Sequence, residues 1–107
     1  MIVPTMNYAN RYLHSDVFPF EIVNRITDKT IDIRAMDAKG GDWTPDCDIG
    51  GFCAHVRNNR SQVWTIESNP SNWVVRIRKH KDGQWRDRDG NRYKLSDRPI
   101  RFHDYNF

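Results

Sequence analysis

The residues with the strongest capacity for chemistry are two cysteines and a histidine near the middle of the chain. Cys47, Cys53 and His55 form a C-x5-C-x-H pattern, and thiolates and imidazoles are ligands that zinc prefers. The spacing departs from the usual C-x2-4-C pairing, and a fourth ligand would have to come from His80, His103 or an aspartate. We therefore expect a protein that holds no metal and no cofactor.

The same three side chains could supply a thiol nucleophile and a base, which is the chemistry of a hydrolase. No orienting third group and no oxyanion loop can be named beside them, so the pattern fails the triad test. The glycine pairs Gly40-Gly41 and Gly50-Gly51 lack the G-K-[ST] ending of a phosphate-binding loop. Two cysteines are too few for a disulfide scaffold, so we expect reduced thiols. The sequence predicts a protein that is not an enzyme.

Positive charge is concentrated in the second half of the chain. Residues 57–107 carry 12 basic and 6 acidic side chains, whereas residues 1–56 carry 5 and 8. Arginine outnumbers lysine 12 to 5, and its planar, bidentate donor suits phosphate and carboxylate partners. This composition favours an anionic or protein partner, although an ordinary charged surface would look similar.

Two predicted strands carry many of these cations on one side. Over residues 73–79 and 91–95 the side chains alternate, so that apolar and basic residues occupy opposite faces. If the two strands pair, four cations share one face of a sheet, which is typical of a surface that contacts phosphates or an acidic protein. Interleaved aspartates could neutralise it. The candidate partner-binding cations are Arg76, Arg78, Lys79, Lys81, Arg86, Arg92 and Lys94.

Four tryptophans could provide stacking platforms for bases or anchors for a protein partner. Trp64 and Trp73 occupy inward positions of predicted strands, where a small core needs bulk. Trp43 and Trp85 are harder to assign to a core. We therefore expect Trp43 and Trp85 on the recognition surface.

A second candidate surface is a predicted loop over residues 37–51, which is rich in glycine, aspartate and proline. Loops of this length are uncommon in compact domains and are enriched in binding roles. With the residues that follow it, this loop brings Trp43, Phe52 and His55 into the set of candidate partner-binding residues.

Strand formers and turn formers dominate the composition. Isoleucine and valine together number 16, against 2 leucines and 4 alanines. We expect a hairpin of residues 17–25 with 30–36, and another of 62–68 with 73–79 across an Asn-Pro-Ser-Asn turn. Asp82-Gly83 and Asp89-Gly90 predict further hairpins. The remaining predicted strands are 84–86, 91–95 and 100–107.

These elements predict a mainly β fold, a small antiparallel barrel or curved sheet of the SH3-like or OB-like kind. We expect one domain over residues 1–107, with residues 1–15 flexible or containing a short helix. No apolar run is long enough to cross a membrane and no secretory signal is visible, so no membrane association is expected. The predicted core comprises Ile22, Ile31, Ile33, Trp64, Ile66, Val75, Ile77, Tyr93 and Leu95.

Several short motifs, in their order and spacing, resemble a family of small tailed-bacteriophage proteins of uncharacterised activity. The resemblance covers residues 15–107. Where the family usually has an arginine after its aspartate, this chain has Val17 after Asp16, so any role of that arginine does not carry over. The matching pieces are the segment 15–23 (SDVFPFEIV), Lys29-Thr30-Ile31, Gly50-Gly51-Phe52 with His55, Gln62 with Trp64, and the closing 104–107 (DYNF).

The resemblance implies a phage origin and a location in the host bacterial cytoplasm, but no reaction. Our hypothesis is a non-catalytic protein that inhibits a host defence factor, such as a CRISPR system, by occupying its surface or sequestering its ligand. The partner would be a host protein or ribonucleoprotein. The alternative is a small basic domain that binds nucleic acid directly in support of phage replication.

Overall fold

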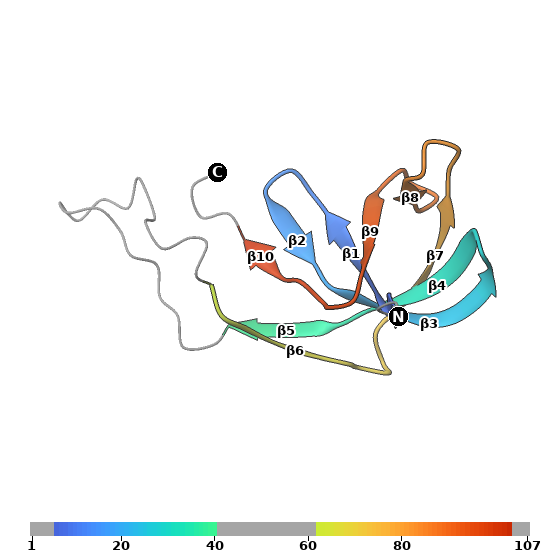
Figure 1. The fold of residues 1–107 in the computed structure, drawn as a ribbon. Helices are drawn as coiled ribbons and strands as arrows, with labels where there is room; N and C mark the ends of the chain where they lie inside the picture. The colour runs from blue at the N-terminus through green and yellow to red at the C-terminus, as the bar shows by residue number, and fades with distance from the viewer. Residues whose placement is uncertain (1–5, 41–61, 104–107) are drawn as a thin grey trace, which may run out of the picture.

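The computed structural model describes residues 6–40 and 62–103, and every regular element within these residues is a β-strand (Figure 1). The mainly β prediction is confirmed. The strands are β1 (Tyr8–Tyr12), β2 (Asp16–Phe18), β3 (Phe20–Thr27), β4 (Thr30–Ala35), β5 (Asp37–Gly40), β6 (Trp64–Glu67), β7 (Val74–Lys79), β8 (Trp85–Arg86), β9 (Arg92–Ser96) and β10 (Phe102–His103).

Six of these strands close into an antiparallel barrel. The pairing runs from β1 through β3, β4, β7, β8 and β9, and β9 pairs back to β1. The prediction of a small antiparallel barrel is therefore confirmed. The expected N-terminal helix is wrong, because β1 is hydrogen-bonded on both edges and tertiary pairing overrides a local helical preference.

Two irregularities in β3 help to close the barrel. The register between β3 and β4 shifts at Val23 and again at Ile26, as in β-bulges. A bulge bends its strand and increases the local twist. Strand β3 can therefore pair with β1 at its start and follow β4 around the barrel.

The barrel encloses a small apolar core. Phe20 is buried, and its ring makes edge contacts with Trp73 at 5.2 Å and Tyr93 at 5.4 Å between centroids. Ile22, Val75 and Leu95 pack against the core while remaining partly exposed. The buried apolar residues are Ala9, Phe20, Ile31, Ile33, Ile77, Trp85 and Tyr93.

A two-stranded ribbon of β5 and β6 extends from the barrel, toward the left of Figure 1. The expected hairpin of residues 62–68 with 73–79 is wrong, because β6 pairs with β5 while β7 pairs with β4. Trp64 and Ile66 consequently lie on the ribbon and not in the barrel core. The first four residues of the expected loop over 37–51 form β5, and the rest of that loop lies outside the described residues.

Asparagine side chains hold the base of the ribbon. Asn69 and Asn72 each donate an amide hydrogen bond to Asp37, at 2.8 and 2.9 Å, and Asn72 also bonds the carbonyl of Ala35. These hydrogen bonds, the one from Asn72 first, lower the pKa of Asp37. The predicted Asn-Pro-Ser-Asn turn is present, with the amide of Asn72 bonded to the carbonyl of Asn69 at 3.0 Å. It links the ribbon to the barrel.

Both predicted Asp-Gly turns are confirmed, joining β7 to β8 and β8 to β9. Gly83 and Gly90 have φ angles of 83° and 86°, in the left-handed region that side chains rarely adopt. In the first turn the side chain of Asp82 accepts a hydrogen bond from the amide of Gln84 at 3.0 Å, and in the second the side chain of Asp87 accepts one from the amide of Asp89 at 2.9 Å. The turns bring three short strands side by side.

The segment between β9 and β10 crosses the outer side of β1. Asn10 is fully buried there, donates to the carbonyl of Arg98 at 3.1 Å and accepts from the amide of Ile100 at 2.9 Å. Because its amide nitrogen and its amide oxygen each have a hydrogen-bond partner, the cost of burying this polar group is offset and the side chain fixes the crossing. Strand β10 then pairs with β2.

Candidate functional site

The outer side of β7, β8 and β9 carries a row of arginines. Arg78 pairs in register with Arg86, Arg86 pairs with Arg92, and Arg92 pairs with Tyr12 of β1. Directly paired residues of antiparallel strands project to the same face. Strands β7 and β9 do not pair directly, because β8 lies between them. We call Arg78, Arg86, Arg92, Lys94 and Tyr12 the basic face.

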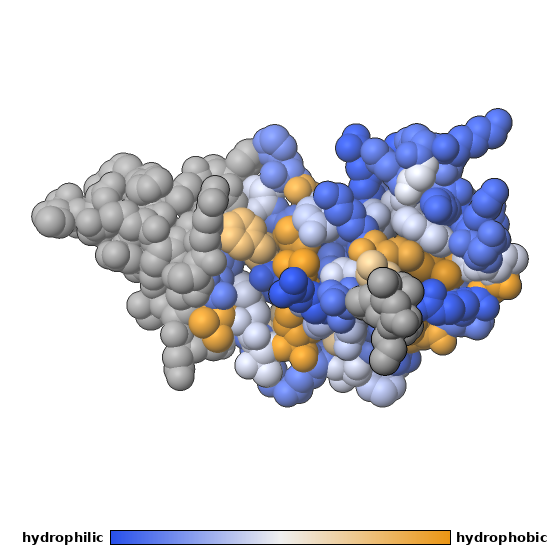
Figure 2. Space-filling model, in the orientation of Figure 1, coloured by the Kyte–Doolittle hydropathy of each residue, from blue (hydrophilic) through white to orange (hydrophobic). Residues whose placement is uncertain are grey.

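The two outer members of the row are the cations available to a partner. In the part of the chain that the structure describes, no carboxylate lies within ion-pair distance of Arg78 or Arg92. Both are exposed. Figure 2 shows hydrophilic side chains over the region where β7 to β9 and their turns lie.

Other cations of the predicted set are partly neutralised. Arg76 forms a two-point contact with Asp32, at 2.9 and 3.3 Å. The hydrogen bond from Arg76 lowers the pKa of Asp32, and the same bond raises the pKa of the guanidinium. Arg86 likewise pairs with Asp82 at 2.8 Å. The interleaved aspartates thus remove part of the patch, and Arg76 contributes less than the sequence suggests.

An aromatic ring lies beside the row. The ammonium of Lys94 stands 5.0 Å from the centre of the Tyr12 ring, a cation-π distance. Tyr12, Lys79 and Lys94, with Trp85 and Tyr93 beneath, also line a broad surface depression of about 1180 Å³. Lys81 is exposed in the turn that follows β7.

The tryptophans are placed differently from the expectation. Trp85 is only 9% exposed and belongs to the core, so its assignment to the recognition surface is wrong. Trp73, expected inside, is 55% exposed because it precedes β7, at the open end of the barrel. Trp43, Phe52 and His55 lie outside the described residues.

A carboxylate organises the turn between β8 and β9. Asp87 accepts hydrogen bonds from two backbone amides, from the Asn91 side chain at 2.8 Å and from the Tyr93 hydroxyl at 2.9 Å. Burial alone would raise the pKa of Asp87, but these donors outweigh it and lower the pKa. Burial, reinforced by Asp87, raises the pKa of Tyr93. The turn thereby fixes the position of Arg92.

A separate cleft of about 450 Å³ opens at the end of the barrel near the ribbon. Four of its ten lining residues are aromatic, and two are arginines. The guanidinium of Arg101 stacks between the rings of Phe18, at 4.4 Å, and Trp64, at 4.7 Å. The lining residues are Arg11, Phe18, Pro19, Phe20, Ala35, Met36, Ala38, Trp64, Trp73 and Arg101.

One hydrogen-bonded link connects the ribbon to β10 beside the cleft. The indole of Trp64 donates to the side-chain oxygen of Gln62 at 2.9 Å, and the backbone amide of His103 donates to the same oxygen at 3.1 Å. The Gln62 amide also donates to the carbonyl of His103. This link holds the indole of Trp64 against Arg101.

Among the residues that line the cleft, Arg11 is the one that sequence analysis missed most clearly. It pairs in register with Tyr93 and Phe18 and so points to the interior side of β1. One guanidinium nitrogen donates to Asn91 at 3.0 Å, while Nε is buried without a hydrogen-bond partner among the described residues. Had residues 8–12 been recognised as a strand, alternation would have placed Arg11 on the same inward face as Ala9, two positions earlier. Arg101 carries no comparable signal.

The described residues hold no cluster of three or more histidine, cysteine, aspartate or glutamate side chains suited to a metal. The cysteine pattern lies outside those residues. Within residues 6–40 and 62–103, no helix is long and apolar enough to cross a membrane. Comparisons with protein-family models, curated proteins and solved structures found no match to this chain.

Proposed function

We propose that this protein is a non-catalytic binding protein whose basic face binds single-stranded nucleic acid. The observation that supports this is the register of Arg78, Arg86 and Arg92, which lie across three neighbouring strands with Tyr12 next in the row. Neighbouring strands are about 4.8 Å apart, so Arg78 and Arg92 present guanidiniums to a phosphate backbone on either side of Arg86, which is paired with Asp82. Tyr12 offers a ring on which a base can stack.

Charge reversal tests this proposal. In the double variant Arg78→Glu/Arg92→Glu, affinity for a fluorescein-labelled 12-nucleotide single-stranded DNA, measured by anisotropy, should fall about 100-fold or more, because like charges then oppose the phosphates. Arg98→Glu is the matched control, since its side chain is 79% exposed and lies outside the basic face. We expect Arg98→Glu to stay within about threefold of the wild type.

An unchanged affinity of the double variant would contradict the proposal, provided its far-UV spectrum matches that of the wild type. Equal losses in the double variant and in Arg98→Glu would also contradict it, since they would show general attraction and no defined surface.

A second candidate is the host-directed inhibitor that docks on an acidic protein. Val74 favours it, because this apolar side chain is 53% exposed on β7, two positions before Arg76 on the same outer face. A protein partner would bury such a side chain beside the cations. Capture of one host protein from nuclease-treated bacterial lysate, lost with Arg78→Glu/Arg92→Glu, would favour this candidate over nucleic acid.

A further inference from the structure

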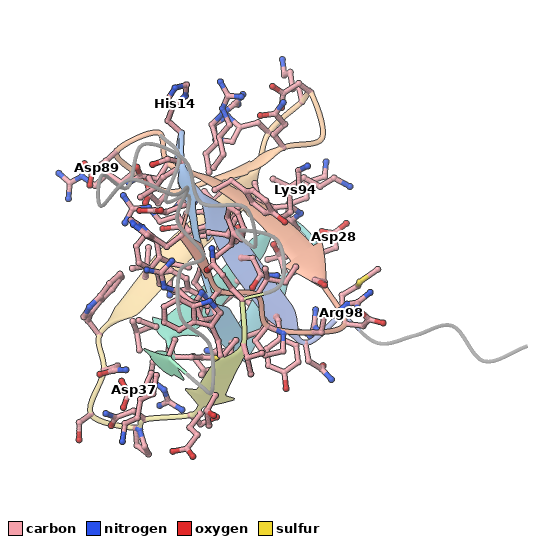
Figure 3. All side chains as sticks on the ribbon, turned by 90° about the vertical axis from the view of Figure 1, so that its left-hand side faces the viewer. His14, Asp28, Asp37, Asp89, Lys94 and Arg98 are labelled. Carbon is pink, nitrogen blue, oxygen red and sulfur yellow. The ribbon has the colours of Figure 1, made fainter. Side chains whose placement is uncertain are left out.

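We propose that the cleft at the ribbon end of the barrel binds a nucleoside monophosphate unit, with the phosphate on Arg11 and Arg101 and the base against Trp73. This site is separate from the basic face and does not depend on it. Figure 3 views the molecule from the side on which the ribbon lies, with Asp37 at the base of the ribbon and His14 at the opposite end.

Arg11 brings an uncompensated guanidinium to the cleft. Arg11 points to the barrel interior, and its buried Nε has no acceptor among the described residues. No carboxylate of that part of the chain lies within 4 Å of Arg11. A buried charged donor without a partner is costly. Because Arg11 lines the cleft, an anion bound there would offset the uncompensated charge of its guanidinium.

Arg101 is the second cation that lines the cleft. The guanidinium carbon of Arg101 lies over the rings of Phe18 and Trp64, and its hydrogen bonds within the described residues go only to backbone carbonyls, through Nη1. Its remaining donors have no carboxylate competitor there. A stacked guanidinium is preorganised to bind an oxyanion, because its orientation is already fixed.

The size and the side chains of the cleft match a nucleotide. A volume of about 450 Å³ is within the range of small-molecule sites. Trp73 contacts the core through Phe20 and leaves more than half of its surface exposed. Inorganic phosphate would leave the aromatic walls unused, and an apolar molecule would leave the guanidiniums unsatisfied. A flat aromatic group joined to a phosphate matches both.

The experiment compares AMP, adenosine and inorganic phosphate by calorimetry and by quenching of tryptophan fluorescence. AMP should bind at least tenfold more tightly than either fragment, because only AMP engages both the arginines and Trp73. Arg11→Met and Arg101→Met should each weaken AMP binding tenfold or more, and Trp73→Leu by about tenfold. Arg98→Met is the control and should bind AMP as the wild type does.

Adenosine or phosphate binding as tightly as AMP would overturn the proposal, as would AMP affinity within twofold of wild type in both arginine variants. No binding of AMP at millimolar concentration would also overturn it. If Arg11→Met does not fold, the test rests on Arg101→Met and Trp73→Leu, whose folding is checked by far-UV spectra. Unchanged AMP affinity in both of these variants would then overturn the proposal.

Two sources of this ligand are distinguishable, a free nucleotide and the phosphorylated end of a strand. In the background of Arg78→Glu/Arg92→Glu, a 5′-phosphorylated trinucleotide that binds more tightly than AMP indicates a strand end, and weaker binding indicates a free nucleotide. AMP should bind this background as it binds the wild type. Loss of DNA binding with AMP binding retained, or the reverse, separates the cleft from the proposed function.

Discussion

The basic face and the cleft both present arginines, but in different physical settings. On the basic face Arg78 and Arg92 are exposed to water, where each charge is solvated and screened by salt. In the cleft Arg101 lies between two aromatic rings, and the Nε of Arg11 is buried. A cation already removed from water loses less hydration on binding, so its interaction with an anion is stronger and less sensitive to salt.

This difference shows that the number of cations at a site does not by itself predict how strongly the site binds an anion. The basic face contains more positive charge, whereas the cleft contains guanidiniums that are partly withdrawn from water. Aspartates neutralise Arg76 and Arg86 on the outside. Within the described residues no aspartate or glutamate does so for Arg11 or Arg101.

The largest expected effect contrasts the tryptophan beneath the basic face with the one at the cleft. Trp85→Ala should lower the free energy of unfolding by about 3 to 5 kcal/mol, because it leaves a cavity in the core. Trp73→Ala should cost only about 1 kcal/mol, since Trp73 is 55% exposed. Urea denaturation of both variants measures the difference. Equal costs would show that the two regions do not differ in burial.

The next effect concerns the turn that positions Arg92. Asp87→Asn replaces an acceptor oxygen with a donor opposite the side chains of Asn91 and Tyr93, and should cost about 2 kcal/mol by urea denaturation at pH 7. Ser96→Ala, in the strand β9 that follows this turn, is the control and should lower the free energy of unfolding less. DNA affinity should fall with Asp87→Asn, whereas AMP affinity should change less.

The same carboxylate predicts a dependence on pH. Its folded pKa is below the ordinary value of about 3.9, so its contribution is complete above that value and is lost as the pH falls through the folded pKa. The melting temperature of the wild type should therefore fall as the pH drops below about 4. Asp87→Asn should lose less over the same range. A parallel fall in both proteins would assign the acid sensitivity to other carboxylates.

Salt separates the two sites directly. With three phosphate contacts on the basic face, single-stranded DNA affinity should fall about 20-fold between 50 and 200 mM salt. AMP affinity for the cleft should fall about threefold or less, because a mononucleotide has no condensed counterions to release. Anisotropy and calorimetry across this salt series measure both. Identical slopes would remove the distinction between the sites.

The smallest effect tests the neutralised cation. Arg76→Met should change DNA affinity by about twofold or less, because Arg76 is already paired with Asp32, whereas Arg78→Met should weaken binding about fivefold. The same titrations compare the two single variants. A larger loss with Arg76→Met would mean that Asp32 releases Arg76 to the partner.

The sequence by itself determined much of the barrel. Alternating residues in 30–36, 73–79 and 91–95 placed Ile33, Ile77 and Tyr93 inside, because one face of each strand is apolar. The Asp-Gly turns were also predictable, since only a left-handed glycine fits their fourth position. These features depend on residues close together in the chain.

Tertiary structure alone decided the partners of the strands and the contents of the cleft. Strand β6 pairs with β5 and leaves Trp64 outside the barrel, although its alternation matches that of an inward strand. Trp73 and Trp85 have exchanged their expected places because barrel closure, not local pattern, determines which end of a strand is covered. Arg11 and Arg101 are 90 positions apart in sequence and line one cleft only because β1, β2 and β10 are neighbours. Pairings between distant segments are set by the burial that the whole barrel achieves, and no local pattern records them.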